Sequence, residues 1–420
     1  MSGRLRAAAL SAAVLAVLMA VAAGCGSGDN GNFNLKIGVL TPLTGSHDVL
    51  GRTGDQATKL AQAQVDAAIR KTGASQSVER LLQDEGPDGS VALRAAERLK
   101  AKHASCVVGP WTTSDVLLTM NQVFVPADTP IVSPAASGDT ISGLHDADLV
   151  NRTVLPDRDQ GPSLAQLMER QLKGGAKGKR AAVAAFDSIY GRNLLRSFLP
   201  AWRKLGGKVV ARFTYKDKSD YTKEVKQLTR HKADAFVVFD TFGTFARMLP
   251  QLQAIKNWKA KKTWSADGLA DPNLTTNTSL FGLRGVAPGS PDKTSAGAAF
   301  NRLWRKATKA PTDRQTYDAQ AFDAYILCYL AAVAAGTSNG GKLADRLRKV
   351  SAPPGKTYTW MQLPQAVAAL QRGEDIDYEG ASGPIDLDGR GDPTAGIFDA
   401  YRISKERVDI QGDIAYPPPL

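Results

Sequence analysis

The stretch from Ser105 to Asp139, SCVVGPWTTSDVLLTMNQVFVPADTPIVSPAASGD, decides the fold class. It contains two short apolar runs, each followed by a loop of small, hydroxyl-rich residues. The runs are Cys106–Val108 and Pro130–Val132, and the loops are Gly109–Ser114 and Ser133–Ser137. Asp115–Val125 between them has a helical pattern. The order strand, loop, helix, strand, loop predicts part of a doubly wound parallel sheet.

Both loops would leave the carboxyl ends of neighbouring strands, where open α/β sheets bind ligands. Thr113 or Ser114 would cap the following helix, and the free N–H groups at a helix start favour an anion. The two loops therefore predict a seat for a carboxylate or another small polar anion. The alternative is that Thr113 and Ser137 serve only as caps.

Composition and charge indicate a two-domain globular protein with a solvated basic surface. The chain has 420 residues, of which 43% are hydrophobic and 22% charged, and its net charge is +12. The lysines and arginines are scattered, and only Lys177–Arg180 and Lys259–Lys262 look clustered. This pattern favours a surface that faces water, anionic lipid or cell wall over a nucleic-acid groove.

The start of the chain predicts export. Arg4 and Arg6 precede an apolar run, Ala7–Ala23, and then Gly24 and Cys25, which is the order of a secretory signal. The end of this run resembles a bacterial lipobox, in which the cysteine is lipidated, although Ala22 stands where leucine is usual. A plain signal peptide or an N-terminal membrane anchor is the alternative.

Residues 1–25 are thus expected to be a lipoprotein signal peptide, and residues 26–34, polar and glycine-rich, a flexible tether. The mature protein would be held at the outer face of the cytoplasmic membrane by lipid on Cys25. Ala324–Ala335 is too short to span a bilayer and is expected to be a buried helix.

Two further cysteines, Cys106 and Cys328, could form a disulfide in an exported protein. Because one lies in a predicted buried strand and the other in a predicted buried helix, we favour two buried thiols. Neither has metal-ligand spacing, and the four scattered histidines form no cluster, so no metal or other cofactor is expected.

Strand and helix patterns alternate twice along the chain. The first series includes a strand at Leu35–Leu40 and a helix at Gly51–Lys71, and it ends with a strand at Leu149–Val154. A second series starts at Ser163 and ends with a strand at Leu283–Ala287. This alternation predicts two α/β lobes with parallel sheets rather than one long sheet.

Three segments together resemble the type I periplasmic solute-binding proteins of ABC transporters, in the branch of the branched-chain amino-acid receptors. The segments are Ile37–Gly45, Val107–Ser137 and Tyr378–Asp392. The resemblance implies two Rossmann-like lobes joined by a three-strand hinge, with crossovers near Leu155–Pro156, Leu283–Arg284 and Arg390–Asp392. The first lobe would comprise residues 35–155 and 284–390, and the second residues 156–283 and 391–420.

The resemblance also implies which residues contact the ligand. Thr113, Ala135 and Ser137 would hold a carboxylate through hydroxyl and backbone groups, and Asp267 would hold an α-ammonium group. Tyr190 would close over the ligand, while Phe242 and Trp111 would form aromatic walls; packing or turn roles remain open for these four residues. Leu50 replaces a usual aromatic wall residue, so the side-chain preference of leucine receptors does not carry over.

The expected function is therefore that of a lipid-anchored receptor that delivers an amino acid or a similar polar solute to ABC permease subunits. A sensor for amides, urea or aromatic acids with the same fold is the alternative. Catalysis is not expected, because no Ser/His/Asp set is suggested and the histidines His47, His103, His145 and His231 sit in unrelated places. No nucleic-acid partner is expected.

Overall fold

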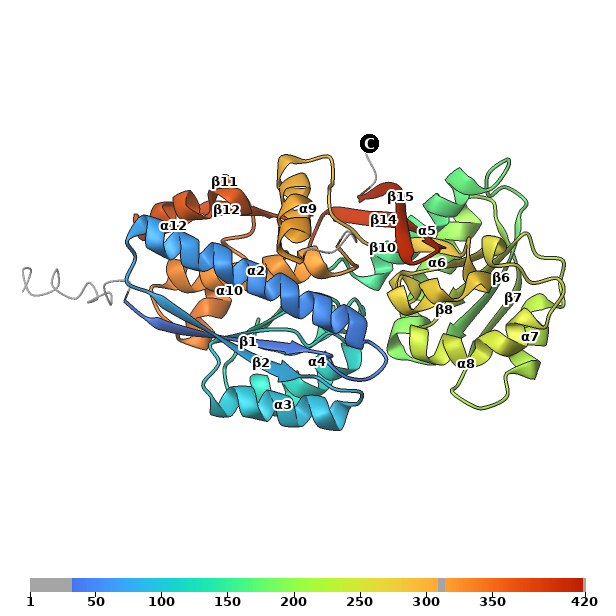
Figure 1. Ribbon diagram of the computed structural model, residues 1–420, viewed down its shortest axis with the longest axis horizontal. Coiled ribbons are helices and arrows are strands. Elements are labelled where there is room, and N and C mark those ends of the chain that lie inside the picture. Colours follow the sequence, from blue (N-terminus) through green and yellow to red (C-terminus); the bar gives the residue numbers. More distant parts are fainter. Residues whose placement is uncertain (1–31, 309–313, 418–420) are drawn as a thin grey trace, which may run out of the picture.

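The computed structural model describes residues 32–308 and 314–417. The predicted signal peptide, Cys25 and the part of the tether before residue 32 lie outside these residues. Two α/β lobes lie side by side along the long axis of the molecule (Figure 1). The two-lobe expectation is confirmed.

The first lobe is built on a five-stranded sheet in which all strands are parallel. In the order β2-β1-β3-β4-β5, its strands are β1 (Asn34–Thr41), β2 (Ser77–Asp84), β3 (Cys106–Val108), β4 (Ile131–Ser133) and β5 (Val150–Arg152). The helices of this part of the chain are α2 (Asp48–Thr72), α3 (Gly89–Ala101) and α4 (Thr113–Thr119), which continues as the π-turn η1 (Met120–Phe124).

Later segments complete the first lobe with four helices and a small sheet. The helices are α9 (Ser295–Thr308), α10 (Asp318–Ala335), α11 (Gly340–Leu347) and α12 (Leu363–Gln371). The sheet comprises β11 (Lys356–Thr359), β12 (Ile376–Gly380) and β13 (Gly383–Pro384). In Figure 1, α2, α10 and α12 lie together over the β1–β2 side of the lobe.

The spacing of the apolar residues in α2 explains why this segment forms a helix and which of its faces is buried. Ala57, Ala61, Val65 and Ala68 recur at helical spacing and are fully buried in the core of the first lobe. The helix ends at Gly73, whose φ of 65° is the left-handed conformation that glycine adopts without steric cost.

The second lobe is built on a seven-stranded sheet. In the order β15-β14-β10-β9-β8-β6-β7, its strands are β6 (Arg180–Phe186), β7 (Lys208–Tyr215), β8 (Ala235–Phe239), β9 (Thr263–Ser265), β10 (Arg284–Pro288), β14 (Gly396–Ser404) and β15 (Arg407–Tyr416). The pairings of β14 with β10 and β15 are antiparallel, and the others are parallel. Its helices are α5 (Asp157–Gln171), α6 (Ile189–Lys204), α7 (Thr222–Thr229) and α8 (Phe242–Gln253).

The sheet pairing corrects one predicted crossover. The prediction at Leu283–Arg284 placed the following strand in the first lobe, but β10 pairs with β9 and β14 inside the second sheet. The chain therefore crosses after Pro288. The other two passages between the sheets are residues 153–156 and 385–395.

A buried arginine ties one of these passages to a loop of the first lobe. Arg152, the last residue of β5, is completely buried, and its Nε donates to Asp392 Oδ1 at 2.8 Å. Its other nitrogens donate to the carbonyl oxygens of Ala136 and Gly138 at 3.1 Å and to Ser142 Oγ at 2.8 Å.

Asp392 also receives a second cation. Arg158 in α5 donates to its Oδ2 at 2.7 Å. Burial alone would raise the pKa of Asp392, but the two arginine charges and the hydrogen bonds it accepts bring that pKa below its usual value. Asp392 is therefore a buried, ionised carboxylate.

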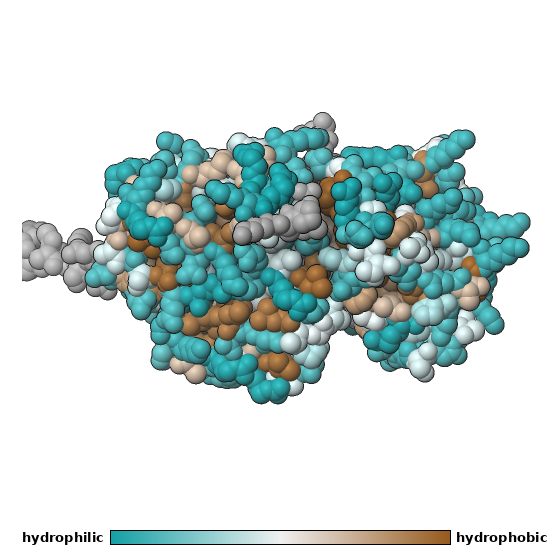
Figure 2. All heavy atoms as spheres, viewed as in Figure 1, coloured by the Kyte–Doolittle hydropathy of each residue, from teal (hydrophilic) through white to brown (hydrophobic). Residues whose placement is uncertain are grey.

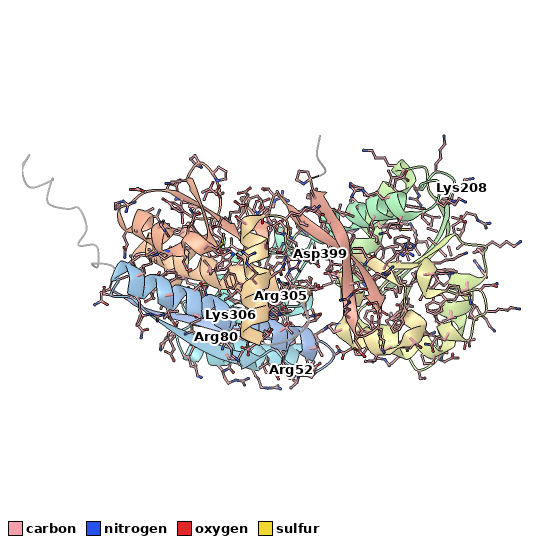
Figure 3. The ribbon with its side chains drawn as sticks, turned by 45° about the horizontal axis from the view of Figure 1, so that its top comes forward. Arg52, Arg80, Lys208, Arg305, Lys306 and Asp399 are labelled. Carbon is pink, nitrogen blue, oxygen red and sulfur yellow. A yellow bond between two sulfur atoms is a disulfide. The ribbon has the colours of Figure 1, made fainter. Side chains whose placement is uncertain are left out.

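A second buried ion pair connects the lobes. Asp399 in β14 lies where the second lobe faces the first (Figure 3), and Arg314 Nη2 approaches its Oδ2 to 2.8 Å. Burial raises the pKa of Asp399 to about 6 against the lowering effect of Arg314. On the face shown in Figure 2, hydrophilic side chains predominate, with smaller hydrophobic groups between them.

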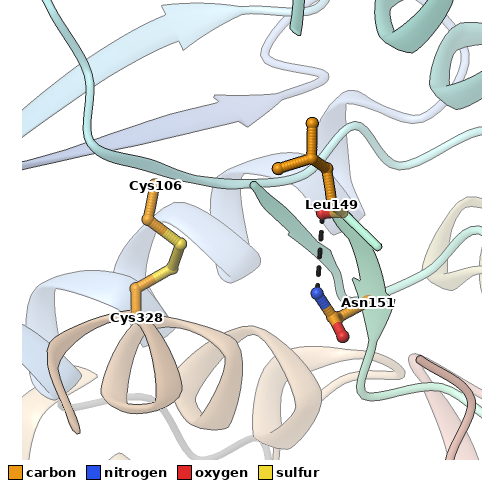
Figure 4. Close-up of a disulfide and its surroundings, with 4 residues drawn as sticks. All are labelled: Cys106, Leu149, Asn151 and Cys328. Carbon is orange, nitrogen blue, oxygen red and sulfur yellow. Dashed lines mark hydrogen bonds between the residues drawn. A yellow bond between two sulfur atoms is a disulfide. The ribbon is translucent and has the colours of Figure 1, made fainter. Parts of the chain in front are cut away.

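Cys106 and Cys328 form a disulfide, so the expectation of two buried thiols is wrong (Figure 4). The reason is the packing of α10 on the sheet: the helix contacts β1, β3 and β4, which brings the two Cα atoms to 5.9 Å, within disulfide range. Sequence spacing gave no sign of this, because 222 residues separate the two cysteines.

α10 is the buried helix that was expected near Ala324–Ala335. Every residue from Asp318 to Val333 is buried. No single helix in residues 32–308 and 314–417 has both the length and the apolar composition needed to cross a membrane; α10 and α11 pass that test only as a pair bent by 107°.

We expect the disulfide to contribute about 2–5 kcal/mol to the free energy of unfolding, because it closes a long loop in the unfolded chain. The double variant Cys106→Ala, Cys328→Ala should lose this amount in denaturant titration under oxidising conditions. In strong reductant the unfolded wild-type chain loses the same constraint, so the two proteins should converge. Equal stability of both proteins without reductant would contradict the assignment.

Asp392→Ala should lower the free energy of unfolding by about 3–5 kcal/mol, because Arg152 would keep a buried charge without its counter-ion. The matched control is Asp217→Ala, which breaks the Arg247–Asp217 pair whose side chains are about half exposed. That control should cost less than about 1 kcal/mol. Similar losses of unfolding free energy for both variants in denaturant titration would show that burial does not increase the contribution of the Arg152–Asp392 pair.

Candidate functional site

A cavity of about 120 Å³ lies between the two lobes. Its first-lobe wall comprises His47, Leu50, Trp111, Thr112, Thr113, Ala135, Ala136, Ser137 and Tyr317. Its second-lobe wall comprises Tyr190, Thr241, Asp267 and Gly268. The loops after β3, β4, β6, β8 and β9 all contribute, so the pocket sits at the carboxyl ends of parallel strands in both sheets, where such sheets bind ligands.

The two hydroxyl-rich loops of the first lobe are bonded to each other. Gly138 N–H donates to Thr113 Oγ1 at 3.0 Å. Ser133 Oγ donates to the Pro110 carbonyl at 2.5 Å and accepts from Ala136 N–H at 3.1 Å. The loops therefore form one connected wall rather than two independent turns.

The predicted capping role of Thr113 or Ser114 is wrong. Thr112 is the N-cap of α4, and its Oγ1 accepts from Asp115 N–H at 3.2 Å. Because the Thr113 hydroxyl is not spent on the cap and accepts from Gly138, its own proton is available to a ligand. Ser137 caps none of the described helices and also lines the pocket.

A buried glutamate positions the loop that carries Trp111. Glu85 is 1% exposed, and its carboxylate accepts from the backbone N–H groups of Trp111 and Thr112, the closest at 2.9 Å. Burial and the neighbouring Asp115 raise the pKa of Glu85 well above its usual value. The Glu85 carboxyl group therefore fixes the backbone segment that leads into α4.

Asp267 dominates the second-lobe wall. It begins the 3₁₀ turn η4 (Asp267–Leu269), directly after β9, and it is 2% exposed. Tyr190 donates to its Oδ1 and Tyr317 to its Oδ2, both at 2.5 Å. Because Tyr317 belongs to the first lobe, the second of these hydrogen bonds bridges the two walls.

Burial raises the pKa of Asp267, although hydrogen bonds from Tyr190, Tyr317 and Gln160 oppose the shift. Tyr190 also accepts from Gly268 N–H at 2.9 Å, so its hydroxyl is held in place while its ring lines the cavity. The role predicted for Tyr190, closing over a ligand, remains a prediction.

A second carboxyl group lies near Asp267 without lining the cavity. Asp157, the first residue of α5, is completely buried and lies beside the Ser137 hydroxyl of the first lobe. Burial and the charge of Asp267 raise its pKa well above the usual value. The second-lobe side of the pocket therefore lacks positive charge and would gain from a cation.

No lysine or arginine is among the described residues that line the cavity. The histidine there, His47, has its pKa lowered by burial, against the opposing charges of Asp115 and Asp48. A ligand carboxylate would thus meet neutral donors, the hydroxyls and backbone amides of the first-lobe loops.

The rest of the pocket is apolar and aromatic. Trp111 and Tyr317 pack edge to face, with ring centroids 5.6 Å apart at 80°. Gly54 in α2 lies so close to Trp111 that a Cβ atom there would come within 2.2 Å of the indole. Leu50 and Ala135 complete this region, where a ligand side chain would rest.

Of the predicted site residues, Leu50, Trp111, Thr113, Ala135, Ser137, Tyr190 and Asp267 line one cavity. Phe242 does not. α8 begins at Phe242, and the ring packs against the core of the second lobe. Its neighbour Thr241 lines the pocket instead.

Sequence reasoning missed His47, Thr112, Ala136, Thr241, Gly268 and Tyr317. Most of these adjoin predicted residues and could have been found by extending each loop by one position. Tyr317 is different, because it comes from the segment before α10, far from any strand end. No group of three or more His, Cys, Asp or Glu side chains in residues 32–308 and 314–417 is placed to hold a metal ion.

Comparison with known proteins identifies the fold. A sequence profile described as periplasmic binding protein matches residues 34–370. The chain is 23% identical over 370 residues to a chemotactic signal transduction system substrate-binding protein, BasB, of Halobacterium salinarum, covering 87% of this chain and 86% of the relative.

Two solved structures share the architecture. A leucine-binding protein of Thermotoga maritima superposes with a TM-score of 0.72 at 20% identity, covering 90% of this chain and 98% of the other. A solute-binding protein of an ABC transporter from R. palustris, solved with benzoate, gives a TM-score of 0.65 at 18% identity, covering 90% and 96%. At these identities the likeness shows the fold alone.

The matched profile covers most of the chain, and the two lobes with their parallel strands and interlobe cavity agree with it. The chain belongs to the periplasmic binding protein family, type I, whose members bind solutes and are not enzymes.

Proposed function

We propose that the protein is the extracytoplasmic substrate-binding component of an ABC importer and captures an amino acid, branched-chain or similar, between its lobes. The observation that carries this proposal is the polarity of the cavity. Neutral donors of the first lobe face a buried aspartate of the second lobe. A zwitterion has the complementary arrangement of charge.

The first-lobe wall suits a carboxylate. The Thr113 hydroxyl has its proton available, and Ser137 adds a second hydroxyl in the adjoining loop. Hydrogen bonds to an ionised acceptor are stronger than those between neutral groups. Neutral donors can therefore hold a carboxylate without an arginine when the site excludes water.

The second-lobe wall suits an ammonium group. The carboxylate oxygens of Asp267 accept one phenol proton each and a hydrogen bond from Gln160, which leaves acceptor capacity for a further donor. An ammonium group placed there would stabilise the ionised form of Asp267 and reduce its repulsion with Asp157.

Size agrees with a small ligand. About one water-sized group fits in each 10–15 Å³ of cavity, so 120 Å³ holds a molecule of roughly ten non-hydrogen atoms. Leu50, Trp111 and Ala135 offer the apolar region for its side chain.

An aromatic acid is the second candidate ligand, since a solved relative was crystallised with benzoate. Benzoate has a carboxylate but no ammonium group, and it would leave Asp267 buried without a cation. The acid pair thus favours the amino acid. A sensing role is the second candidate process, because the relative from Halobacterium salinarum is named for chemotactic signalling.

We also propose that lipid on Cys25 anchors the protein at the outer face of the membrane, beside its permease subunits. The sequence supports this through the signal-like order of Arg4, the apolar run Ala7–Ala23 and Cys25. Uptake of the labelled ligand, lost when the gene is deleted, would separate import from sensing.

Asp267→Asn should weaken the binding of branched-chain amino acids by roughly thirtyfold or more, because a buried charge pair would lose one partner. Isothermal titration measures this. Binding of benzoate should not weaken, since benzoate places no cation there. The matched control Asp220→Asn removes an exposed second-lobe carboxylate and should leave both affinities unchanged.

The amino-acid proposal fails if the wild-type protein binds benzoate or another acid without an amine but none of the amino acids. It also fails if Asp267→Asn weakens both ligand classes equally, since that result would indicate a general packing role.

The affinity for an amino acid should fall as the pH is lowered. Burial raises the pKa of Asp267 above 3.8, so the carboxylate that pairs with the ammonium group is protonated at a higher pH than an exposed aspartate. Affinity is thus complete above this raised pKa and is lost as the pH falls through it. Titrations between about pH 4.5 and 7, where the ligand stays zwitterionic, should show the loss, and Asp267→Asn should flatten the profile.

A further inference from the structure

The end of the second lobe farthest from the pocket is strongly basic. The strands β6, β7, β8 and β9 are parallel, so their amino ends meet at one edge of the sheet, opposite the pocket edge. β10 begins at this edge, and the β14–β15 turn returns to it because β14 is antiparallel to β10. Figure 3 shows Lys208, the first residue of β7, at this end of the molecule.

Lysine or arginine begins or precedes every strand that starts here. The residues at these strand starts are Arg180, Lys208, Lys232, Lys261, Lys262 and Arg284. Loops and helix ends at the same edge add Lys173, Lys177, Arg203, Lys204, Lys256 and Lys259. Together with Arg402, Lys405 and Arg407 at the β14–β15 turn, these residues form what we call the basic face.

Few carboxylates oppose these charges. Asp409 pairs with Arg407 and lies 3.9 Å from Arg402, and Glu406 lies 4.0 Å from Lys405. Asp234 and Glu169 lie at the same edge and accept backbone N–H groups, those of Arg180 and Ala176. In the described part of the chain, no carboxylate lies within ion-pair distance of Lys177, Lys208 or Lys261, and all three side chains are exposed. The charge of the face is therefore largely uncompensated.

Helix dipoles explain only part of this pattern. Arg203 and Lys204 occupy the last turn of α6, where cations are favourable. Lys177, Lys208 and Lys261 lie in loops or at strand starts. In the first lobe, the equivalent edge is mixed, with Lys71 before β2 and Lys102 before β3, but Asp128 before β4 and Asp146 and Asp148 before β5. The fold therefore does not by itself require a basic edge.

We propose that the basic face binds the anionic phospholipid headgroups of a membrane surface. The charges are spread over many loops rather than along a groove, which suits a flat, charged partner. Lysine predominates, and its compact charge on a flexible stem suits diffuse contact with phosphates better than bidentate recognition. Basic residues near an anionic bilayer contribute additively to such binding.

The contact is electrostatic and does not involve insertion. The exposed large apolar side chains in the described residues are Met361 and Ile410, which is too few for an apolar anchor. Figure 2 shows hydrophilic side chains over this end of the molecule. Binding of a single-stranded nucleic acid would instead require exposed aromatic rings on which bases stack, and the exposed large apolar side chains of the described residues include no aromatic ring.

The test is sedimentation of the chain from Gly26 onward, which contains every described residue, with lipid vesicles. Vesicles of phosphatidylglycerol and phosphatidylcholine should bind the protein at low salt, and pure phosphatidylcholine should bind it at least about tenfold more weakly. Binding should disappear at ~0.5 M salt, where the Debye length is a few ångströms.

The triple variant Lys177→Glu, Lys208→Glu, Lys261→Glu should bind the anionic vesicles about a hundredfold more weakly. The matched control Lys71→Glu, Lys102→Glu, Lys349→Glu makes the same change in net charge on exposed first-lobe lysines and should retain binding. Ligand affinity at the pocket, measured in parallel, reports folding of both variants.

Three results would overturn the proposal. These are equal binding to neutral and anionic vesicles, equal losses in the two triple variants, and binding of a nucleic acid at lower concentration than anionic lipid. None of these outcomes depends on which solute fills the pocket, so failure here leaves the proposed function intact.

Discussion

The buried guanidinium of Arg152 is the contact on which the arrangement of the pocket depends. It stands at the end of β5 and bonds at once to Asp392, in the last passage between the lobes, and to the carbonyls of Ala136 and Gly138, in a pocket loop. A buried charge without such partners would be strongly destabilising. The position of the pocket loop is thus coupled to the position of the connection between the lobes, so that a movement of one would displace the other.

Besides Arg152, two buried carboxyl groups determine the structure of the cavity walls. Glu85 accepts hydrogen bonds from backbone N–H groups of the Trp111 loop and so fixes this part of the first-lobe wall, but Glu85 itself does not line the cavity. Asp267 points into the cavity and is steadied by two phenols from different lobes. The two walls therefore differ in polarity because Glu85 is hydrogen-bonded to the backbone, whereas Asp267 faces the cavity and can contact a ligand.

The sequence carried the general plan of the molecule but not its long-range contacts. Strand ends located Thr113, Ser137 and Asp267 correctly at one cavity, because the carboxyl ends of parallel strands converge in any such sheet. Phe242 does not line this cavity, because α8 begins at this residue and its ring packs against the core of the second lobe. The strands β11 and β12 were missed, although β12 (Ile-Asp-Tyr-Glu-Gly) alternates apolar and polar residues and its buried positions alternate too. The strand at Arg284 was assigned to the wrong lobe.

Tyr317 and the disulfide could not have been predicted from local patterns. Both depend on how α10 settles against the first sheet, a contact between segments separated by some 200 residues in the sequence. The role of Arg152 had one local sign, a charged residue closing a short buried strand, but its partners come from three different segments.

The bond between Cys106 and Cys328 also bears on how the protein can move. β3 leads into the loop of Trp111 and Thr113, and α10 follows directly after Tyr317, so the disulfide connects the two segments that supply Trp111, Thr112, Thr113 and Tyr317 to the first-lobe wall. A movement of the lobes that admits and releases a solute would therefore keep the spacing of these two segments and would take place at the three connecting segments.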